Sequence, residues 1–254
     1  MSHYIAFFKK ELLESTRTYK MQIMLSIFFV FGVMSPLTAK LTPELISAFM
    51  PEGMSISLPE PSAFDSWTQF FKNISQMGLL IMVIVFSGTL SAEITKGTLI
   101  NMLTKGLLRP AVIISKYFCM ALVWTISLMV SFLVTLGYTT YLFSGDGVAN
   151  LLFSVFCLWL FGMFLLALLL FSSTVASGNY AGLLVTGGVV VAFMICGIMP
   201  NFHEYSPLSL SSKNMDLITN AIEASSMYAS ILISGALTLV LVVLSVAIFR
   251  KKQL

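Results

Sequence analysis

The sequence has little charge and almost no histidine. Only 10% of its 254 residues are Asp, Glu, Lys or Arg, two are His, and 57% are hydrophobic. A soluble domain of this length cannot bury so much apolar surface, so the composition predicts an all-α, polytopic membrane protein. At about 20 residues per span, the chain has room for six transmembrane helices and their loops.

Motifs of catalysis are also lacking. The sequence has no G-x-x-x-x-G-K-[ST] phosphate-binding loop, so we do not expect the chain to hydrolyse ATP by itself. G-x-S-x-G and H-E-x-x-H are missing, and His203 has Glu204 beside it but no third metal ligand nearby. The three cysteines lie in apolar runs, which predicts buried thiols and no disulfide framework. We therefore expect a non-catalytic chain that binds no metal and no cofactor.

The basic residues are scattered over loop segments and form no stripe with aromatic residues. Nucleic acid is therefore not an expected partner. Residues 2–20 combine charge with apolar side chains at helical spacing. Tyr4, Ile5, Phe8 and Leu12 predict one apolar face. The other faces carry Lys9, Lys10, Glu11, Glu14 and Arg17. We predict an amphipathic helix in the cytoplasmic interface, and the long charged region disfavours a signal peptide.

Six apolar runs predict the spans, at about residues 21–38, 73–92, 112–142, 151–172, 180–199 and 228–249. Four prolines between residues 39 and 72 predict an irregular outer loop there, apart from a short helix at 43–50. We expect one membrane domain over residues 1–254, divided as follows: 1–20 interfacial helix, 21–92 first two spans, 93–110 polar loop, 111–199 next three spans, 200–227 outer amphipathic segment, and 228–254 last span with a basic tail.

The charge distribution predicts the orientation. With six spans and a cytoplasmic N-terminus, eleven of the fourteen basic residues lie inside, and only Lys40, Lys72 and Lys213 lie outside. This is the positive-inside bias, so both termini are expected in the cytoplasm and the protein in the cell membrane.

No charged residue is expected in the middle of a span, which argues against an ion-coupled transporter. It favours a path lined by apolar, aromatic, Met, Ser and Thr groups, although hydroxyl groups could equally supply a polar lining. Small residues at 178, 182, 187 and 188 predict close helix packing, either within one subunit or between subunits.

One polar stretch, residues 91–116, separates two long apolar runs. Its motif is Glu93-Ile-Thr-Lys-Gly97-Thr-Leu99, followed by Arg109-Pro110 and Ser115-Lys116. By itself it is either a solvated basic loop or a short docking helix. The stretch resembles the segment after the second membrane helix in permease subunits of ABC-2-type transporters, where that segment is the coupling helix that binds the ATPase subunit.

The resemblance implies a six-helix permease of an ATP-driven exporter. Its partners would be two copies of an ABC ATPase subunit, which bind ATP and Mg, a second permease in a homodimer or heterodimer, and membrane lipids. The docking residues that it implies are Glu93, Lys96, Gly97, Thr98, Leu99, Ile100, Leu103, Lys105 and Arg109. The apolar spans favour an amphipathic peptide or a hydrophobic drug as cargo. A membrane scaffold, immunity or sensor subunit and an ion-coupled secondary transporter are the alternatives.

The outer segment 200–227 carries one more amphipathic pattern. Ser211 or Ser212 would cap a helix from about 213 to 224, with Met215, Ile218 and Ile222 on one side. Such a helix resembles the outer-leaflet helices that cap the path of ABC-2 permeases, which makes these three residues outer gate candidates. An interfacial anchor is the other interpretation.

Overall fold

Helices form nearly all of the described chain. The computed structural model describes residues 2–48, 60–95, 97–104, 106–143, 148–176, 178, 180–197, 199 and 205–252. Within these residues, five stretches are long and apolar enough to cross a membrane: Lys20–Glu44, Ala63–Thr95, Arg109–Leu142, Leu151–Val175 and Ala224–Lys251. The predicted all-α membrane fold is confirmed, with five candidate spans where the sequence predicted six.

The first span is longer than its sequence indicated. Helix α1 (Ser2–Arg17) turns at Thr18 and Tyr19 into α2 (Lys20–Ala48), which packs along α7 (Arg109–Leu142). We expected a loop after residue 38, but α2 continues through both Pro36 and Pro43. Pro36 has no N–H to offer the carbonyl of Gly32, and the Thr135 hydroxyl of α7 donates to that carbonyl at 3.2 Å instead. A neighbouring helix thus replaces the bond that proline removes.

The second span begins ten residues before its predicted start at Asn73. It consists of α3 (Ala63–Asn73), a π-helical turn η1 (Ile74–Gly78) and α4 (Leu79–Phe86), followed after a turn by α5 (Ser91–Thr95). The backbone N–H of Ser62 donates to Asp65 Oδ2 at 2.9 Å, which stabilises the start of α3. Lys72, predicted in the outer loop, therefore lies inside a helix.

Two long helices form the centre of the bundle. Helix α7 and α8 (Leu151–Val175) carry about half of the buried side chains, and α13 (Tyr228–Lys251) packs along α8. Their bounds agree within a few residues with the predicted spans. The Trp124 indole of α7 lies directly against Gly162 of α8, where an added Cβ would come within 2.3 Å of the ring. Its Nε1–H donates to the Trp159 carbonyl at 3.1 Å.

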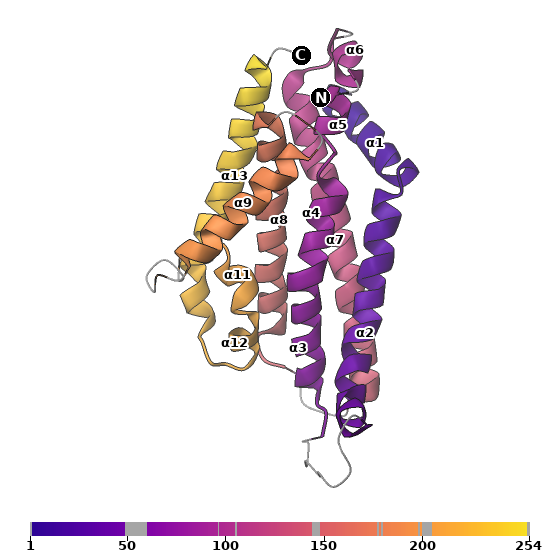
Figure 1. Cartoon of the computed structure of the whole chain (residues 1–254), viewed down its shortest axis with the longest axis vertical. Coiled ribbons are helices and arrows are strands. Elements are labelled where there is room, and N and C mark those ends of the chain that lie inside the picture. Colours follow the sequence, from indigo (N-terminus) through magenta and orange to yellow (C-terminus); the bar gives the residue numbers. More distant parts are fainter. Residues whose placement is uncertain are drawn as a thin grey trace.

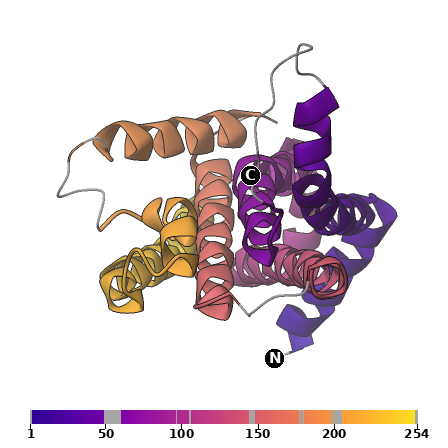
Figure 2. The same cartoon turned by 90° about the horizontal axis from the view of Figure 1, so that it is seen from below.

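The fifth predicted span is short. Helix α9 (Ala181–Cys196) has 16 residues, about 24 Å at 1.5 Å per residue, less than the ~30 Å of a hydrocarbon core. It packs mainly on α8 and diverges from the bundle as it descends (Figures 1 and 2).

The outer segment is not one helix. It forms α11 (Ser209–Ser212), α12 (Asn214–Ile218) and a 3₁₀ turn η2 (Ala224–Met227) before α13 begins. The predicted helix 213–224 fails because Asn220 adopts a positive φ of 55°, where the backbone N–H groups of Ala221 and Ile222 both donate to the Asp216 carbonyl. Both ends of the chain lie at the end of the bundle that carries α5 and α6 (Thr98–Thr104), opposite α12 (Figure 1).

We expect Thr135→Val to destabilise the protein by about 0.6–1.5 kcal/mol, because the Gly32 carbonyl loses its donor within the membrane. The loss should shrink in a Pro36→Ala background, where the restored N–H serves the same carbonyl. Reversible unfolding in mixed micelles measures both. Thr140→Val is the control, since that hydroxyl bonds only within its own helix. Equal losses at the two threonines would contradict the assignment.

Candidate functional site

Five charged side chains meet where α1, α5 and α7 come together. We call this group the ion-pair cluster: Lys10, Glu11, Glu14, Glu93 and Lys116. Lys116, on α7, is 0% exposed, and its Nζ donates to both carboxylate oxygens of Glu11 at 2.9 Å. The same Nζ lies 2.7 Å from Glu93 Oε2, as an ion pair outside hydrogen-bond geometry. A single buried ammonium therefore joins the N-terminal helix to the segment that precedes α6.

Lys10 completes the cluster from its more exposed side. Its Nζ contacts Glu11, Glu14 and Glu93. Burial alone would lower the pKa of Lys10, but hydrogen bonds to Glu14 and Glu93 and the charge of Glu11 outweigh burial and raise this pKa above its ordinary value. Burial would raise the pKa of Glu14, but Lys10 outweighs it and the pKa of Glu14 falls below its ordinary value.

Helix α1 packs against the protein with the side that carries Glu11, and part of its predicted apolar face remains exposed. Phe7, Glu11 and Ser15 are buried against α7, whereas Ile5 and Leu13 are 55% and 59% exposed. The periodicity placed Glu11 away from the apolar face of the helix. The sequence alone does not show that Lys116 of α7 lies opposite this carboxylate. The exposed apolar side chains leave α1 with a surface for lipid, in keeping with an interfacial helix.

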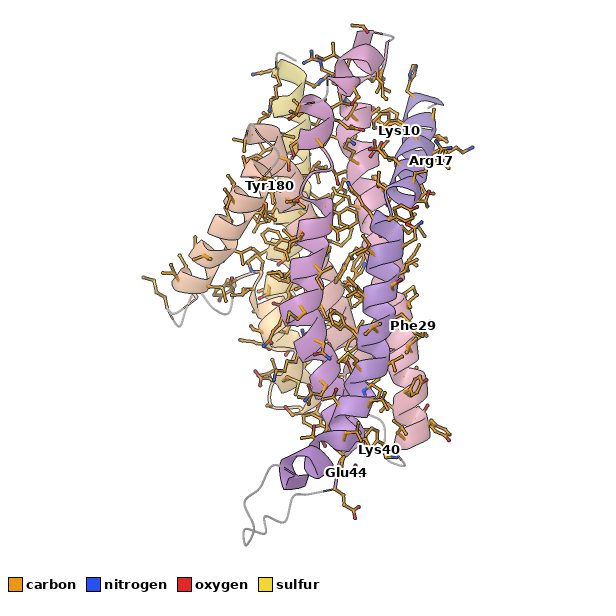
Figure 3. The ribbon with its side chains drawn as sticks, turned by 45° about the vertical axis from the view of Figure 1, so that its right-hand side comes forward. Lys10, Arg17, Phe29, Lys40, Glu44 and Tyr180 are labelled. Carbon is orange, nitrogen blue, oxygen red and sulfur yellow. The ribbon has the colours of Figure 1, made fainter. Side chains whose placement is uncertain are left out.

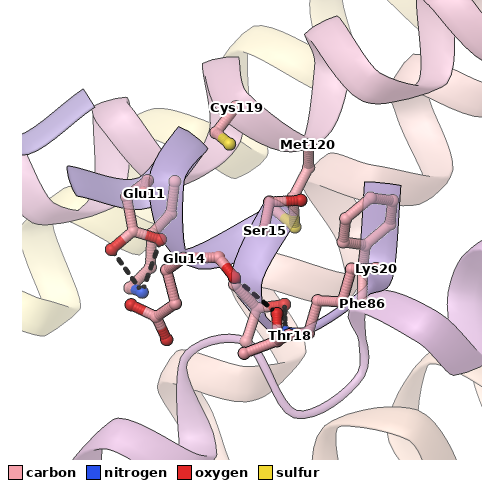
Figure 4. Close-up of a pocket in the computed structure, with 10 residues that line it drawn as sticks. Glu11, Glu14, Ser15, Thr18, Lys20, Phe86, Cys119 and Met120 are labelled. Carbon is pink, nitrogen blue, oxygen red and sulfur yellow. Dashed lines mark hydrogen bonds and ion pairs between the residues drawn. The ribbon is translucent and has the colours of Figure 1, made fainter. Parts of the chain in front are cut away.

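A cavity of about 10 Å³ lies beside the cluster, lined in part by Glu11, Glu14, Ser15, Lys20 and Cys119 (Figure 4). This volume is at the lower limit for one water molecule. Three of the carboxylates also lie close enough to one another to hold a metal ion. The ammonium groups of Lys10 and Lys116 already bind these oxygens, so the arrangement is one of ion pairing.

Helix α6 follows the cluster directly. Gly97 and Gly106 bound it with positive φ angles of 68° and 91°, which side chains with a Cβ rarely adopt. Leu99 is 1% exposed, so it packs inside this chain, Leu103 is half-buried, and Thr98 and Ile100 face outward, with Ile100 40% exposed. Lys96 and Lys105 lie outside the described residues. The exposed side of α6 is thus available to a partner, and Leu99 holds its other side to the bundle.

Arg109, also predicted in the docking set, binds its own chain. Its Nη1 donates to the carbonyls of Phe249, Arg250 and Lys252 at 3.2, 2.9 and 2.7 Å, which caps the C-terminal end of α13. Lys252 Nζ donates to the Thr174 carbonyl at 2.8 Å and caps α8 in the same way. These two cations tie α7, α13 and α8 together at the end where the termini lie.

A groove of about 1140 Å³ lies between α3–η1–α4 and α9, with Phe161 and Leu165 of α8 as its floor. We call it the lateral groove. Its walls are mostly apolar, from Leu79–Ile84 on one side and Leu183–Met194 on the other, and the outer segment closes one end. Lys10 and Lys40 mark the two ends of the bundle in Figure 3.

The three outer gate candidates do not form one surface. Met215 lines the lateral groove, Ile218 is buried in the core, and Ile222 is half-buried. Among the small residues of α9, Gly182 makes the expected close contact within the subunit, since an added Cβ would lie 2.5 Å from Ser173 Oγ. Gly187 and Gly188 line the groove instead.

Residues 5–254 match the family model described as ABC-2 family transporter protein. The chain belongs to this family. It is a multi-pass membrane subunit of the ABC-2 transporter type, and the family normally works with an ABC ATPase partner. Among curated proteins, none matches the sequence.

The sequence predicted the short helix α6 but neither the ion-pair cluster nor the lateral groove. Glu93 was expected to contact the ATPase, and the structure places it against Lys10 and Lys116 of its own chain. Lys116, seven residues after the start of an apolar helix, was the available signal, because a charge in such a place needs a partner. That partner stands 105 residues earlier in the sequence.

We expect Lys116→Met to free α1 from the bundle, because Lys10 alone would then face three carboxylates, two of them buried, at a cost of about 3–5 kcal/mol. Tryptic cleavage after Arg17 should accelerate and the unfolding free energy should fall. Adding Glu11→Gln should restore part of the loss. Lys9→Met, at an exposed position, is the control, and equal sensitivity of both lysines would argue against the cluster.

The contribution of Glu14 should depend on pH. Its pKa is lowered in the folded chain, so it stabilises the docked α1 above pH ~4.5, and this contribution disappears as the pH falls through the lower folded-state value. Glu14→Gln should therefore cost about 0.2–1 kcal/mol at pH 7, since Glu14 is partly exposed, and nothing in strong acid. Unfolding of both proteins across this range measures the difference, and a constant difference would contradict the ion pair.

Proposed function

We propose that the chain is the permease subunit of an ATP-driven exporter and that α6 is the coupling helix. The observation that carries this is the position of α6 beside the ion-pair cluster. The helix presents Thr98 and Ile100 outward, while the preceding α5 is tied through Glu93 to α1 and α7. A displacement of α6 by a partner would thus reach three membrane-associated elements at once.

The nine residues of the predicted docking set divide into two roles. Thr98 and Ile100 would contact the ATPase directly, with Lys96 and Lys105 supplying charge. Glu93, Gly97, Leu99, Leu103 and Arg109 would position the segment, because they are packed or bonded within the chain or shape its turn. ATP and Mg would be bound by two copies of the ATPase, whose closure shifts the permease toward another conformation.

The lateral groove supports a transport path on the side of α4 and α9. It is larger than most sites for drug-sized ligands, which occupy about 300–1,000 Å³, and its apolar walls suit a hydrophobic or amphipathic cargo. A second permease would complete the path from the other side. Both termini lie at the same end of the bundle, as they must if both are cytoplasmic. The positive-inside bias supports this orientation in the cell membrane.

Purification from the native host in mild detergent tests the assignment. We expect a nucleotide-binding subunit to copurify at equal stoichiometry. Ile100→Asp should lower the amount of copurified subunit at least tenfold and leave membrane insertion unchanged, because a charge would face an apolar groove of the partner. Leu108→Asp is the matched control, an exposed apolar residue just beyond α6. A chain that purifies without a nucleotide-binding partner would favour the scaffold or sensor function instead.

A further inference from the structure

Lys72 is a charged side chain at membrane depth. Asn73 beside it donates to Ser35 Oγ at 3.1 Å, and Ser35 lies about 22 Å along α2 from Lys20 at 1.5 Å per residue. In a core of ~30 Å whose cytoplasmic boundary is at Lys20, this level belongs to the outer half. Charged residues in such places face a cavity and mark binding sites or pathways.

Lys72 faces the lateral groove and is the one charged residue among those that line it. Its side chain is exposed, and it makes no ion pair or hydrogen bond with any side chain in the described part of the protein. Asp65, the acidic residue nearest to Lys72 in sequence, accepts hydrogen bonds at the start of α3 instead. Among the described residues, the groove therefore carries one positive charge that has no acidic partner.

The polar groups of the groove gather around this charge. Gln76 lies one turn further along the second span, within the π-helical turn η1. Ser75, Ser211 and Ser212 line the same part of the groove, and Ser75 Oγ donates to the Ser211 carbonyl at 3.4 Å. Away from this end the walls are apolar apart from Thr186, whose hydroxyl is bonded to Gly182 of its own helix. The groove is thus polar and positive at one end and apolar along the rest.

The backbone of the walls selects against an extended peptide. Helices α4 and α9 satisfy their own N–H and C=O groups, so the apolar part offers no partner to the backbone of a bound peptide. An acyl chain has no such groups to satisfy. A lipid with one acidic head group and apolar acyl chains matches the positive end and the apolar part of the groove.

We propose that the lateral groove binds an anionic lipid of the outer leaflet. The Lys72 ammonium contacts its acidic head group, Gln76 and the Ser212 hydroxyl donate to the head-group oxygens, and the acyl chains lie between α4 and α9. The inference rests on the proposed function for the orientation, which makes this leaflet the outer one, and for treating the lipid as a candidate cargo; binding itself requires no ATPase.

Photocrosslinking tests the site in the full-length chain with its copurifying partners, reconstituted in phosphatidylcholine nanodiscs. The probes are phosphatidylglycerol and phosphatidylcholine with the same diazirine-bearing acyl chain. We expect phosphatidylglycerol to label peptides of α4 and α9 more strongly than phosphatidylcholine. Lys72→Met should reduce that preference roughly two- to five-fold, the contribution of one partly exposed charge pair. Lys72→Glu should abolish it.

Lys40→Met is the matched control, because Lys40 is also an exposed lysine of the outer end but does not line the groove. Gly188→Trp fills the groove from a position with open space around it and should reduce labelling by both lipids. Retained phosphatidylcholine labelling in Lys72→Met shows that the variant is folded.

Equal labelling by the two lipids, or the same loss in Lys40→Met and Lys72→Met, would overturn the inference. Absence of any label at α4 and α9 would also overturn it and assign the groove to a second copy of the chain or to a peptide. The ATPase in the same preparation separates the two proposals. If the ATPase copurifies but the two lipids label equally, only the lipid site is contradicted. If phosphatidylglycerol labels more strongly but no ATPase copurifies, only the exporter function is contradicted.

Discussion

The buried contact of Lys116 with Glu11 and Glu93 organises one end of the molecule. Between membrane helices there is little hydrophobic drive, since lipid is as apolar as the side chains it would replace, so polar contacts and close packing decide which helices associate. Here one ammonium with no exposure to solvent fixes α1, α5 and α7 relative to one another. Separating α5 or α7 would leave Glu93 or Lys116 without a partner in a medium of low dielectric constant, and separating α1 would break both bonds between Glu11 and Lys116. The cluster thus favours motion of these elements as one unit.

Arg109 and Lys252 extend that constraint to the other long helices. Both bind carbonyl groups that helix ends leave without partners, so α7, α13 and α8 are joined through their termini. The bundle is consequently fastened at the end of α6 and the two chain termini. In the proposed transporter this is the end at which the ATPase acts, and a fastened end transmits displacement better than a loose one.

Local signals in the sequence were sufficient for the long helices. The apolar runs at 112–142, 151–172 and 228–249 end at polar or basic residues, and their helices end within a few residues of these limits. Where the sequence misled, a distant partner decided the outcome. Pro36 by itself predicts a break in the helix. Thr135, 99 positions later, donates a hydrogen bond to the Gly32 carbonyl that the proline leaves without a partner. Lys72 was predicted in a loop, but its helix begins at Ala63, where the contact of Ser62 with Asp65 stabilises the first turn. The ion-pair cluster needed residues 11, 93 and 116 together, and the groove is a property of how α9 leans, which no single stretch of sequence encodes.

The contact of Gly182 with Ser173 has a mechanical consequence. Near its beginning, α9 lies so close to Ser173 of α8 that backbone and side chain leave no room for even a methyl group. Further along, Gly187 and Gly188 have no neighbouring atoms within 4 Å of an added Cβ. Near the other end of α9, Phe193 contacts Phe164 of α8 with ring centroids 6.1 Å apart, and such a contact between side chains adjusts more easily than the backbone contact at Gly182. A helix held most rigidly at one end tilts about that end rather than slides. The width of the space between α9 and α4 is then governed by the tilt of a single helix, and the small side chain at position 182 is what sets the position of the pivot.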